Sequence, residues 1–345
     1  MPVSVSWRRF RRYKQDLNRP DTLDYSQLPK LFLVSDLHGS EAVLNKTINS
    51  AKFYGVKNIV IAGDLTGKLL VPIIRESDEE YSLNLFGEVK RITMTKLAET
   101  QKQIRNSGFY YRVVTKSEYE DLAQNKDKVK NAFLEAMKED LKSFLSKAEE
   151  RLKPFGAKLY FFPGNDDYEE VAQFIQEYRS DTIVPFDQAV AELEGGYELV
   201  GYGYSNPTPW NTPREKSEEE IYKDLSALMQ KVDHKKVLLV THVPPVDTII
   251  DKAPKLTSDL KPVLVGGEYQ MVSVGSTSVR KIIQEFMPMV GLHGHIHESG
   301  GVDQVKVSKR VSVFNPGSDY GAGILRGVII QLDDDRVKNY LFTKG

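Results

Sequence analysis

The sequence predicts a mixed α/β protein, built from mixed sheets with helices on their outer faces. The first observation is that short apolar runs of strand length alternate with helical patterns, which is typical of βαβ units. The second is that turn signals such as Gly195-Gly196 join later strand candidates into hairpins. A chain of 345 residues can form two domains, or one large domain with an insertion, and either arrangement buries a sizeable core.

The first predicted unit is a strand at residues 31–35, a helix at about 41–54 that Gly55 closes, and a strand at 58–62. This order predicts a parallel pair of strands joined by the helix. Three aspartates at 333–335 supply a turn near the end of the chain. The remaining strand candidates lie at residues 159–162, 188–193, 197–204, 237–241, 289–292, 303–307, 310–314 and 327–332.

Residues 68–154 differ from the rest, and we interpret them as an insertion between two core strands. They contain a predicted hairpin at 81–93 and a charged helix at about 126–152, whose apolar residues recur at spacings of three and four. A lid and a dimerisation surface are both open roles for such a segment. The main domain is therefore expected to span 31–345, preceded by a basic arm at 1–30.

The composition restricts the chemistry that this chain can perform. It has 47 Lys and Arg against 48 Asp and Glu, so no overall field attracts nucleic acid or anionic lipid. Because it has no Cys, thiolate zinc sites, iron–sulfur ligation and thiol nucleophiles are excluded. No apolar run reaches the ~20 residues of a membrane span, and the arginine pairs at 8–12 precede polar sequence rather than an export signal. We therefore expect a cytoplasmic protein without membrane contact.

Five short motifs carry side chains that can bind metals, and four of them directly follow an apolar strand candidate. Open α/β sheets place their ligands at these strand ends. Four of the six histidines fall in the motifs, and His293 adjoins the last of them. The motifs are Asp36-Leu37-His38, Gly63-Asp64, Gly164-Asn165-Asp166-Asp167, His242 and Gly294-His295-Ile296-His297.

These residue types suit a pair of divalent ions about 3.5–4 Å apart, which can clamp the attacking and leaving oxygens of a phosphoryl displacement. Such a pair needs a shared carboxylate, and Asp64 suits that role because each of its oxygens can hold one ion. An amide at Asn165, in place of another carboxylate, keeps net positive charge on the pair and acidifies a bridging water. The resulting hydroxide is expected to attack phosphorus in line.

The ordered set of motifs resembles the calcineurin-like metallophosphoesterases, over most of the chain from Asp36 to His297. The resemblance implies a four-layer α/β/β/α sandwich, in agreement with the predicted strands and helices. Three local sequences look more narrowly like the predicted phosphoesterases related to Icc: His242-Val243-Pro244-Pro245, Gly294-His295-Ile296-His297-Glu298-Ser299 and Asn315-Pro316-Gly317-Ser318.

The resemblance also implies roles for individual residues. It assigns one ion to Asp36, His38, Asp64 and His297, and the other to Asp64, Asn165, His242 and His295. The residues expected to act in catalysis are Asp64, Asn165, His242 and His295. Of these, His242 or His295 is expected to hydrogen-bond a phosphate oxygen. We expect two manganese ions, with iron, zinc or nickel as alternatives that the same ligands accept.

One position departs from the family pattern. Many members have a histidine after the Gly-Asn pair, thought to assist the leaving group, whereas this chain has Asp166. An ordinary Asp is ionised at pH 7, so Asp166 acts as an acid only if burial or the neighbouring Asp167 raises its pKa toward neutrality. We expect instead that a metal or a water stabilises the leaving group. Members without this histidine resemble phosphodiesterases more often than monoesterases, which favours a diester as substrate.

Residues beside the motifs are candidates for support or for substrate binding. Asp167 is expected to orient a ligand or backbone, and His293 to be a hydrogen-bonded core histidine rather than a residue that faces the site. Asn315 lies in a turn that either shapes the site or only follows a strand. Trp210, in a Pro-rich loop, is expected to cover the core rather than to stack a nucleobase.

The expected function is a phosphodiesterase that hydrolyses a small phosphodiester. One alternative is a nuclease acting on DNA or RNA ends, which the basic and aromatic residues at 7–14 favour and the near-neutral charge opposes. The other is a catalytically inactive protein-binding scaffold of the same fold, which the complete set of ligand types opposes. Nucleic acid is thus not the favoured partner, and a homo-oligomer is left open.

Overall fold

The computed structural model describes residues 28–345, so residues 1–27 of the predicted basic arm lie outside the described chain. Its first unit confirms the predicted βαβ arrangement: β1 (Lys30–Val34), α1 (Glu41–Tyr54) and β2 (Asn58–Ala62). Strands β1 and β2 pair in parallel, with Phe32 opposite Ile59. The helix ends at Gly55, whose φ of 63° is the left-handed conformation that closes a helix at low steric cost.

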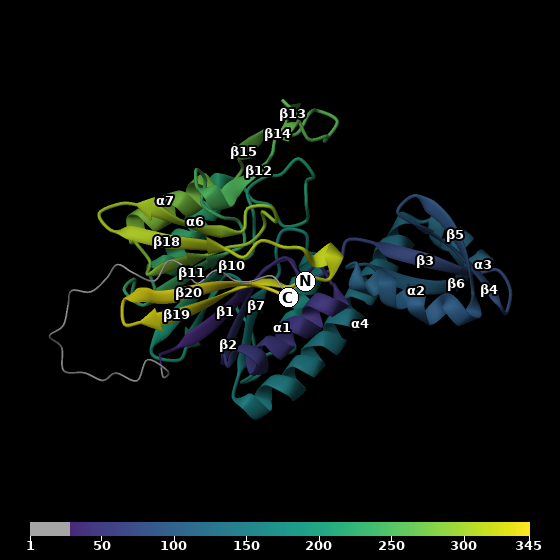
Figure 1. Cartoon of the computed structure of the whole chain (residues 1–345), viewed down its shortest axis with the longest axis horizontal. Helices are drawn as coiled ribbons and strands as arrows, with labels where there is room; N and C mark the ends of the chain where they lie inside the picture. Colours follow the sequence, from purple (N-terminus) through teal and green to yellow (C-terminus); the bar gives the residue numbers. More distant parts are fainter. Residues whose placement is uncertain (1–27) are drawn as a thin grey trace, which may run out of the picture.

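Two six-stranded mixed sheets stack face to face in the centre of the molecule (Figure 1). The first sheet has the order β20-β19-β1-β2-β7-β8, where the new members are β7 (Lys158–Phe162), β8 (Ile183–Pro185), β19 (Arg326–Asp333) and β20 (Arg336–Lys344). The second has the order β17-β18-β16-β11-β10-β9, with β9 (Ala189–Leu193), β10 (Tyr197–Tyr202), β11 (Val237–Thr241), β16 (Val290–Leu292), β17 (Gly301–Lys306) and β18 (Arg310–Asn315). Every strand candidate of the sequence corresponds to one of these strands.

Three apolar cores separate four layers. The central core lies between the sheets and joins side chains such as Leu33 and Phe162 to Leu238 and Leu292. A second core packs the first sheet against α1, α4 (Lys126–Leu152) and α5 (Glu169–Gln176). A third packs the second sheet against α6 (Glu218–Met229) and α7 (Thr277–Phe286). The fold is therefore the predicted four-layer α/β/β/α sandwich.

Residues 68–154 form two different structures. A separate subdomain, drawn at the right of Figure 1, has the sheet order β5-β4-β3-β6 and its own small core around Ile73, Leu83 and Ile104. Its elements are β3 (Leu70–Arg75), β4 (Glu80–Leu85), β5 (Glu88–Thr93), α2 (Met94–Asn106), β6 (Tyr110–Thr115) and α3 (Lys116–Ala123). The helix α4 instead packs on the first sheet, so it belongs to an outer layer of the sandwich.

A second projection leaves the sandwich between β11 and α7, and lies at the top of Figure 1. It consists of short paired strands, which are β12 (Lys252–Pro254), β13 (Leu264–Val265), β14 (Glu268–Tyr269) and β15 (Met271–Ser273). Among residues 28–345, no helix has the length and apolar composition that crossing a bilayer requires.

Asp140 on α4 predicts that the stability of the fold depends on pH. Burial raises the pKa of its carboxyl to about 6, although Arg105 opposes this shift. A carboxyl with a raised pKa in the folded state makes ionisation unfavourable, so it lowers stability as pH rises from about 4 through about 6.

We expect Asp140→Asn to increase the free energy of unfolding by about 1–2 kcal/mol at pH 8 and by little at pH 4, because the amide cannot ionise. Urea denaturation of the metal-free protein at the two pH values measures this. The control is Glu139→Gln, a change at an exposed neighbour on the same helix. An equal effect of Asp140→Asn at both pH values would contradict the raised pKa of Asp140.

Candidate metal centre

The seven predicted ligands all follow strands whose carboxyl ends meet at one edge of the sandwich. Asp36 and His38 follow β1, Asp64 follows β2 and Asn165 follows β7, all in the first sheet. In the second sheet, His242 follows β11, and His295 and His297 follow β16. Because the two sheets are stacked, their loops face each other across this edge, where α/β sheets form ligand crevices.

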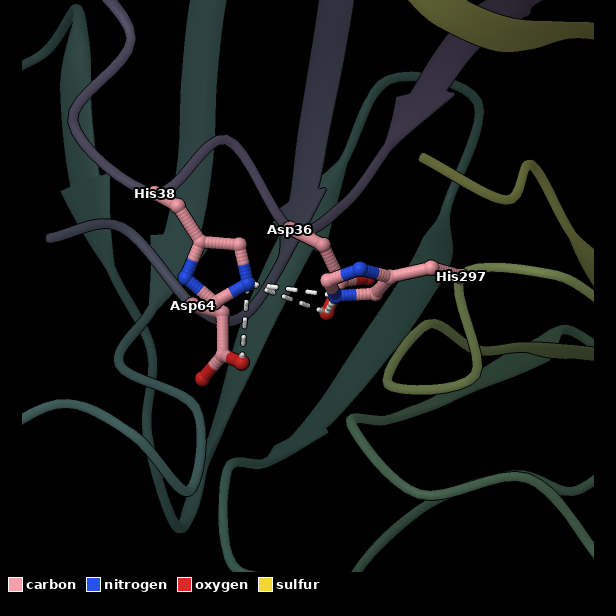
Figure 2. A group of neighbouring side chains, drawn as sticks. All are labelled: Asp36, His38, Asp64 and His297. Atoms are coloured by element: carbon pink, nitrogen blue, oxygen red, sulfur yellow. Dashed lines mark hydrogen bonds and ion pairs between the residues drawn. The ribbon is translucent and has the colours of Figure 1, made fainter. Parts of the chain in front are cut away.

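Four of the side chains form one compact cluster: Asp36, His38, Asp64 and His297 (Figure 2). One ligand atom from each lies within 4.8 Å of all the others. Nε2 of His38 lies 3.2 Å from Nε2 of His297 and 3.5 Å from Oδ2 of Asp64. Nε2 of His297 lies 3.3 Å from Oδ1 of Asp36. Two imidazoles and two carboxylates therefore converge on one small volume.

The protonation of this cluster suits replacement of a proton by a cation. Burial lowers the pKa of His38 to about 3, so its ring is neutral at pH 7 and can donate a lone pair. Burial alone would lower the pKa of His297, but the carboxylate of Asp36 raises it. His297 is therefore the more basic of the two facing imidazoles, and a metal ion would compete with a proton for the space between them.

Asp36 offers a further test of whether the cluster fits a metal. Burial works against its ionisation, yet His297 and His242 hold the pKa of Asp36 well below its ordinary value. Its Oδ1 atom is buried and has no hydrogen-bond partner among the described residues. Buried carboxylate oxygens are normally paired. This oxygen faces Nε2 of His297 at 3.3 Å and Nε2 of His38 at 4.0 Å, so a cation between the carboxylate and the two imidazoles would satisfy it.

Asp64 joins this cluster to a second group. Its Oδ2 atom faces His38, whereas its Oδ1 atom lies 3.5 Å from Nε2 of His242 and accepts a hydrogen bond from the backbone N–H of Asp166 at 3.0 Å. Nε2 of His242 is in turn 2.8 Å from Oδ1 of Asn165. Although burial works against it, His242 and His38 lower the pKa of Asp64, so the carboxylate is ionised. Its two oxygens thus face two separate sets of donors.

In the second group, as in the first, a histidine carries a proton where a metal ion could bind. His242 Nδ1 donates to the carbonyl of Ala62 at 2.7 Å, which fixes the ring and turns Nε2 toward Asn165. Burial opposes its charge, but Asp64 raises the pKa of His242 to about 9, so without metal the ring is protonated at neutral pH. The amide of Asn165 is oriented by its own hydrogen bond to Thr212 Oγ1 at 2.9 Å. A cation would take the place of the proton on Nε2.

His295 completes this group from the other side. Its ring centroid is 5.0 Å from that of His242, and its backbone N–H donates to Oδ2 of Asp36 at 2.9 Å. Burial and the charge on His242 lower the pKa of His295 to about 4, so the imidazole is neutral and able to bind a metal. The structure therefore brings all seven predicted residues together around Asp64.

The backbone at these residues is strained. Asp36, His38, Asp64 and His295 have φ values of 56°, 43°, 53° and 68°, in the left-handed region that non-glycine residues rarely adopt. Each such residue costs on the order of 1 kcal/mol and persists only where its surroundings hold it. Backbone hydrogen bonds from Asp36 and His38 to the carbonyls of Gly63 and Asp64 supply that restraint. Strain concentrated in this way is typical of functional sites.

Two of the candidate supporting residues hold the loops rather than face the cluster. Asp167 accepts hydrogen bonds from the N–H groups of Leu65, Thr66 and Gly164, and so ties the loop after β2 to the loop after β7. The amide of Asn315 donates to the carbonyls of Gly294 and Ile296, which fixes the loop that carries His295 and His297.

His293 is also outside the cluster. It is buried, its Nδ1 atom lies 2.9 Å from the hydroxyl of Thr241, and burial lowers its pKa to about 3. It is therefore the hydrogen-bonded core histidine that we expected.

Two residues that sequence reasoning missed also lie at the site. Lys68 lines the same cleft as Asp64 and forms an ion pair of 2.5 Å with Asp166. Tyr320 packs its ring 4.5 Å from that of His38 and 5.7 Å from that of His297, measured between centroids. Lys68 follows the Gly63-Asp64 motif by four residues, and this short spacing is the sequence signal that could have placed it at the site. No sequence signal placed Tyr320 there.

The ion pair sets the charge of both partners. Burial and Asp64 raise the pKa of Asp166 above its ordinary value, although Lys68 opposes this shift. Burial disfavours the charge on Lys68, but Asp166 and Asp64 raise its pKa, so the ammonium stays protonated. Asp166 thus pairs with a lysine that remains positively charged beside the cluster.

A cleft of about 900 Å³ opens from the centre and is lined by Asp64, Lys68, Asn165, His295 and His297 at one end. Trp210 lies on its wall with 61% of its surface exposed, so the expectation that this side chain covers the core was wrong. The tryptophan follows two prolines in a loop that extends outward from β10, beyond the reach of the apolar cores. The nearby Tyr202 is buried.

Comparison with known proteins supports the fold. No protein-family profile matches the chain. An uncharacterized protein of Methanocaldococcus jannaschii is 36% identical over 145 residues, which are 41% of this chain and 57% of that protein. The chain thus spans little more than half the length of this curated relative.

Solved structures align over most of the chain. One crystal structure has a TM-score of 0.54 at 14% identity, over 92% of this chain and 99% of that chain. A Thermus thermophilus protein has a TM-score of 0.48 at 13% identity, over 92% and 98% of the two chains. An archaeal phosphodiesterase has a TM-score of 0.37 at 11% identity, over 92% and 99%. At such identities the first similarity indicates a shared fold and nothing more.

Gly164 provides a test of how tightly the backbone packs against the shared carboxylate of Asp64. A Cβ atom at this position would lie 2.1 Å from Oδ1 of Asp64, so any side chain displaces the shared carboxylate. We expect Gly164→Ala to weaken manganese binding about 10- to 100-fold. The rise in melting temperature on adding manganese measures this. Gly321→Ala, where a Cβ meets no atom within 4 Å, is the control, and unchanged manganese binding by Gly164→Ala would refute the geometry.

Proposed function

We propose that the chain is a dinuclear metal-dependent phosphoesterase that hydrolyses a small phosphodiester. The observation that carries the proposal is the position of Asp64, whose two carboxylate oxygens face two different sets of imidazole and amide donors. A shared carboxylate of this kind is the element that a two-metal site needs.

Each set would hold one ion. Asp36, His38, Asp64 and His297 are proposed for the first, and Asp64, Asn165, His242 and His295 for the second. When bound, the two ions would supply positive charge to the phosphate and lower the pKa of a water molecule so that hydroxide is available at neutral pH. The set contains nitrogen and oxygen donors only, which suits manganese, the metal we favour, and is also compatible with iron, zinc and nickel.

The residues of the chain itself have defined tasks in this proposal. Lys68 holds a positive charge in the cleft next to Asp64, where it can neutralise a phosphate oxygen. Asp166 forms an ion pair with Lys68 and keeps it in place, and in this proposal it is not the acid for the leaving group. Tyr320 packs against His38 and His297 and fixes the orientation of their rings.

A diester is the favoured substrate for two reasons. The position at which many metallophosphoesterases have a histidine is Asp166 here, and that aspartate is committed to Lys68. The cleft also continues well beyond the centre, which leaves room for a second ester substituent.

The shared ligand gives the first test. We expect Asp64→Ala to reduce bound manganese from about two ions per chain to none and to reduce turnover at least about a thousandfold, because both ions lose a ligand. Hydrolysis of bis-p-nitrophenyl phosphate and p-nitrophenyl phosphate by metal-stripped protein with added manganese measures turnover, with the diester preferred. Asp181→Ala, a change at an exposed aspartate, controls for the lost charge. Two retained ions or retained activity in Asp64→Ala would overturn the proposal.

Lys68 gives a test that separates charge in the cleft from metal binding. We expect Lys68→Ala to keep both manganese ions but to lower kcat/KM for the diester about 10- to 100-fold, since a charge next to the phosphate is lost. Lys255→Ala, a change at a lysine that lines the far part of the cleft, should have little effect. If Lys68→Ala hydrolyses the diester like the unaltered protein, the lysine has no part in the reaction.

A further inference from the structure

The cleft that begins at the metal centre changes character along its length. Its inner end carries Asp64, Lys68, Asn165 and the two histidines of the last motif. Its outer walls come from two segments of the second-sheet side: the loop after β10, which includes Trp210, and the projection formed by β12 to β15. The amide of Asn206 donates to the carbonyl of Val274 at 3.3 Å and so ties the two walls together.

The outer walls are largely apolar. Side chains that line them include Pro207, Trp210, Leu256, Leu260, Val272 and Val274. Trp210 and Leu260 are 61% and 44% exposed, so their apolar surfaces face solvent in the cleft. A cleft of about 900 Å³ is far larger than a phosphate group and has the size of a site for a ligand with a large body.

The donors of two threonines on these walls are already in use within the protein. The hydroxyls of Thr208 and Thr212 both donate to Oε1 of Glu215, each at 2.6 Å. The N–H groups of the same two threonines also donate to the Glu215 carboxylate. A sugar or a base edge with acceptor atoms binds through free donors, and these threonines offer none. Asn206, Lys255 and Glu298 are further polar residues of the lining, but most residues of the walls are apolar, which suits a hydrocarbon chain better than a nucleoside.

From this arrangement we propose that the substrate is an amphiphilic phosphodiester, with one long alkyl-like substituent that lies along the apolar walls. The inference rests on the proposed function, because it places the phosphate at the metal centre and beside Lys68. A ligand that is anionic at one end and apolar at the other matches a cleft whose inner end would hold the two metal ions beside Lys68 and whose outer part is mostly apolar. Burial of each methylene contributes roughly a fourfold gain in binding.

The test compares two esters that differ only in chain length, n-octyl p-nitrophenyl phosphate and methyl p-nitrophenyl phosphate, with the manganese-loaded full chain. We expect kcat/KM for the octyl ester to exceed that for the methyl ester at least about tenfold. The p-nitrophenyl ester of thymidine 5′-phosphate serves as the nucleoside arm, and we expect it to be hydrolysed less efficiently than the octyl ester. Equal values for the octyl and methyl esters, or a preference for the nucleoside ester, would overturn the inference while leaving the phosphoesterase proposal intact.

Two leucines of the projection provide a matched pair of variants. Leu256 lines the cleft, whereas Leu264 on β13 is 60% exposed and lies outside the lining. We expect Leu256→Ser to lower the octyl-to-methyl ratio of kcat/KM about threefold or more, and Leu264→Ser to leave that ratio as it is. A ratio that falls equally in both variants, or in neither, would contradict the placement of the chain along the walls.

Binding separates failure of the inference from failure of the proposed function. If neither ester is hydrolysed, the phosphoesterase proposal fails, and calorimetric titration with n-octyl phosphate and methyl phosphate then decides the inference. We expect n-octyl phosphate to bind at least about tenfold more tightly. Equal affinities would show that the apolar walls do not recognise a chain.

Discussion

The carboxylate of Asp64 is the group around which the site is arranged. It is buried, it faces His38 with one oxygen and His242 with the other, and its pKa is held low by those two imidazoles. One imidazole comes from the loop after β1 and the other from the loop after β11, so the carboxylate spans the two sheets. Its position is maintained only if the sheets pack at a fixed separation, which the apolar core between them enforces.

The parts of the fold that could be predicted are those that local sequence determines. The run 237–241 is apolar and of strand length, and it forms β11 with the same bounds. The helix at 126–152 was predicted from the spacing of its apolar residues. In the structure, the side chain of Asn125 caps its start by accepting hydrogen bonds from the first turn. The ligand residues could be located for the same reason: they follow apolar runs directly, and parallel strands bring their carboxyl ends to one edge.

What sequence could not supply depends on contacts between distant segments. Lys68 acquires its role from an ion pair with Asp166, and Tyr320 from packing on histidines that are far from it in the chain. Trp210 was expected in the core because large aromatics are usually buried, but its loop projects into the cleft. Helix α4 has the apolar stripe of any amphipathic helix, and only the folded chain shows that this stripe packs on the first sheet while β3 to α3 form a separate subdomain.

The central claim is that Asp64 lies between two metal ions, and electron paramagnetic resonance of the manganese-loaded protein tests it most directly. Two ions bridged by one carboxylate lie about 3.5–4 Å apart, so their spins must be coupled. The account predicts a coupled two-manganese spectrum once two equivalents have bound. Two equivalents bound with only the six-line spectrum of isolated manganese would contradict it.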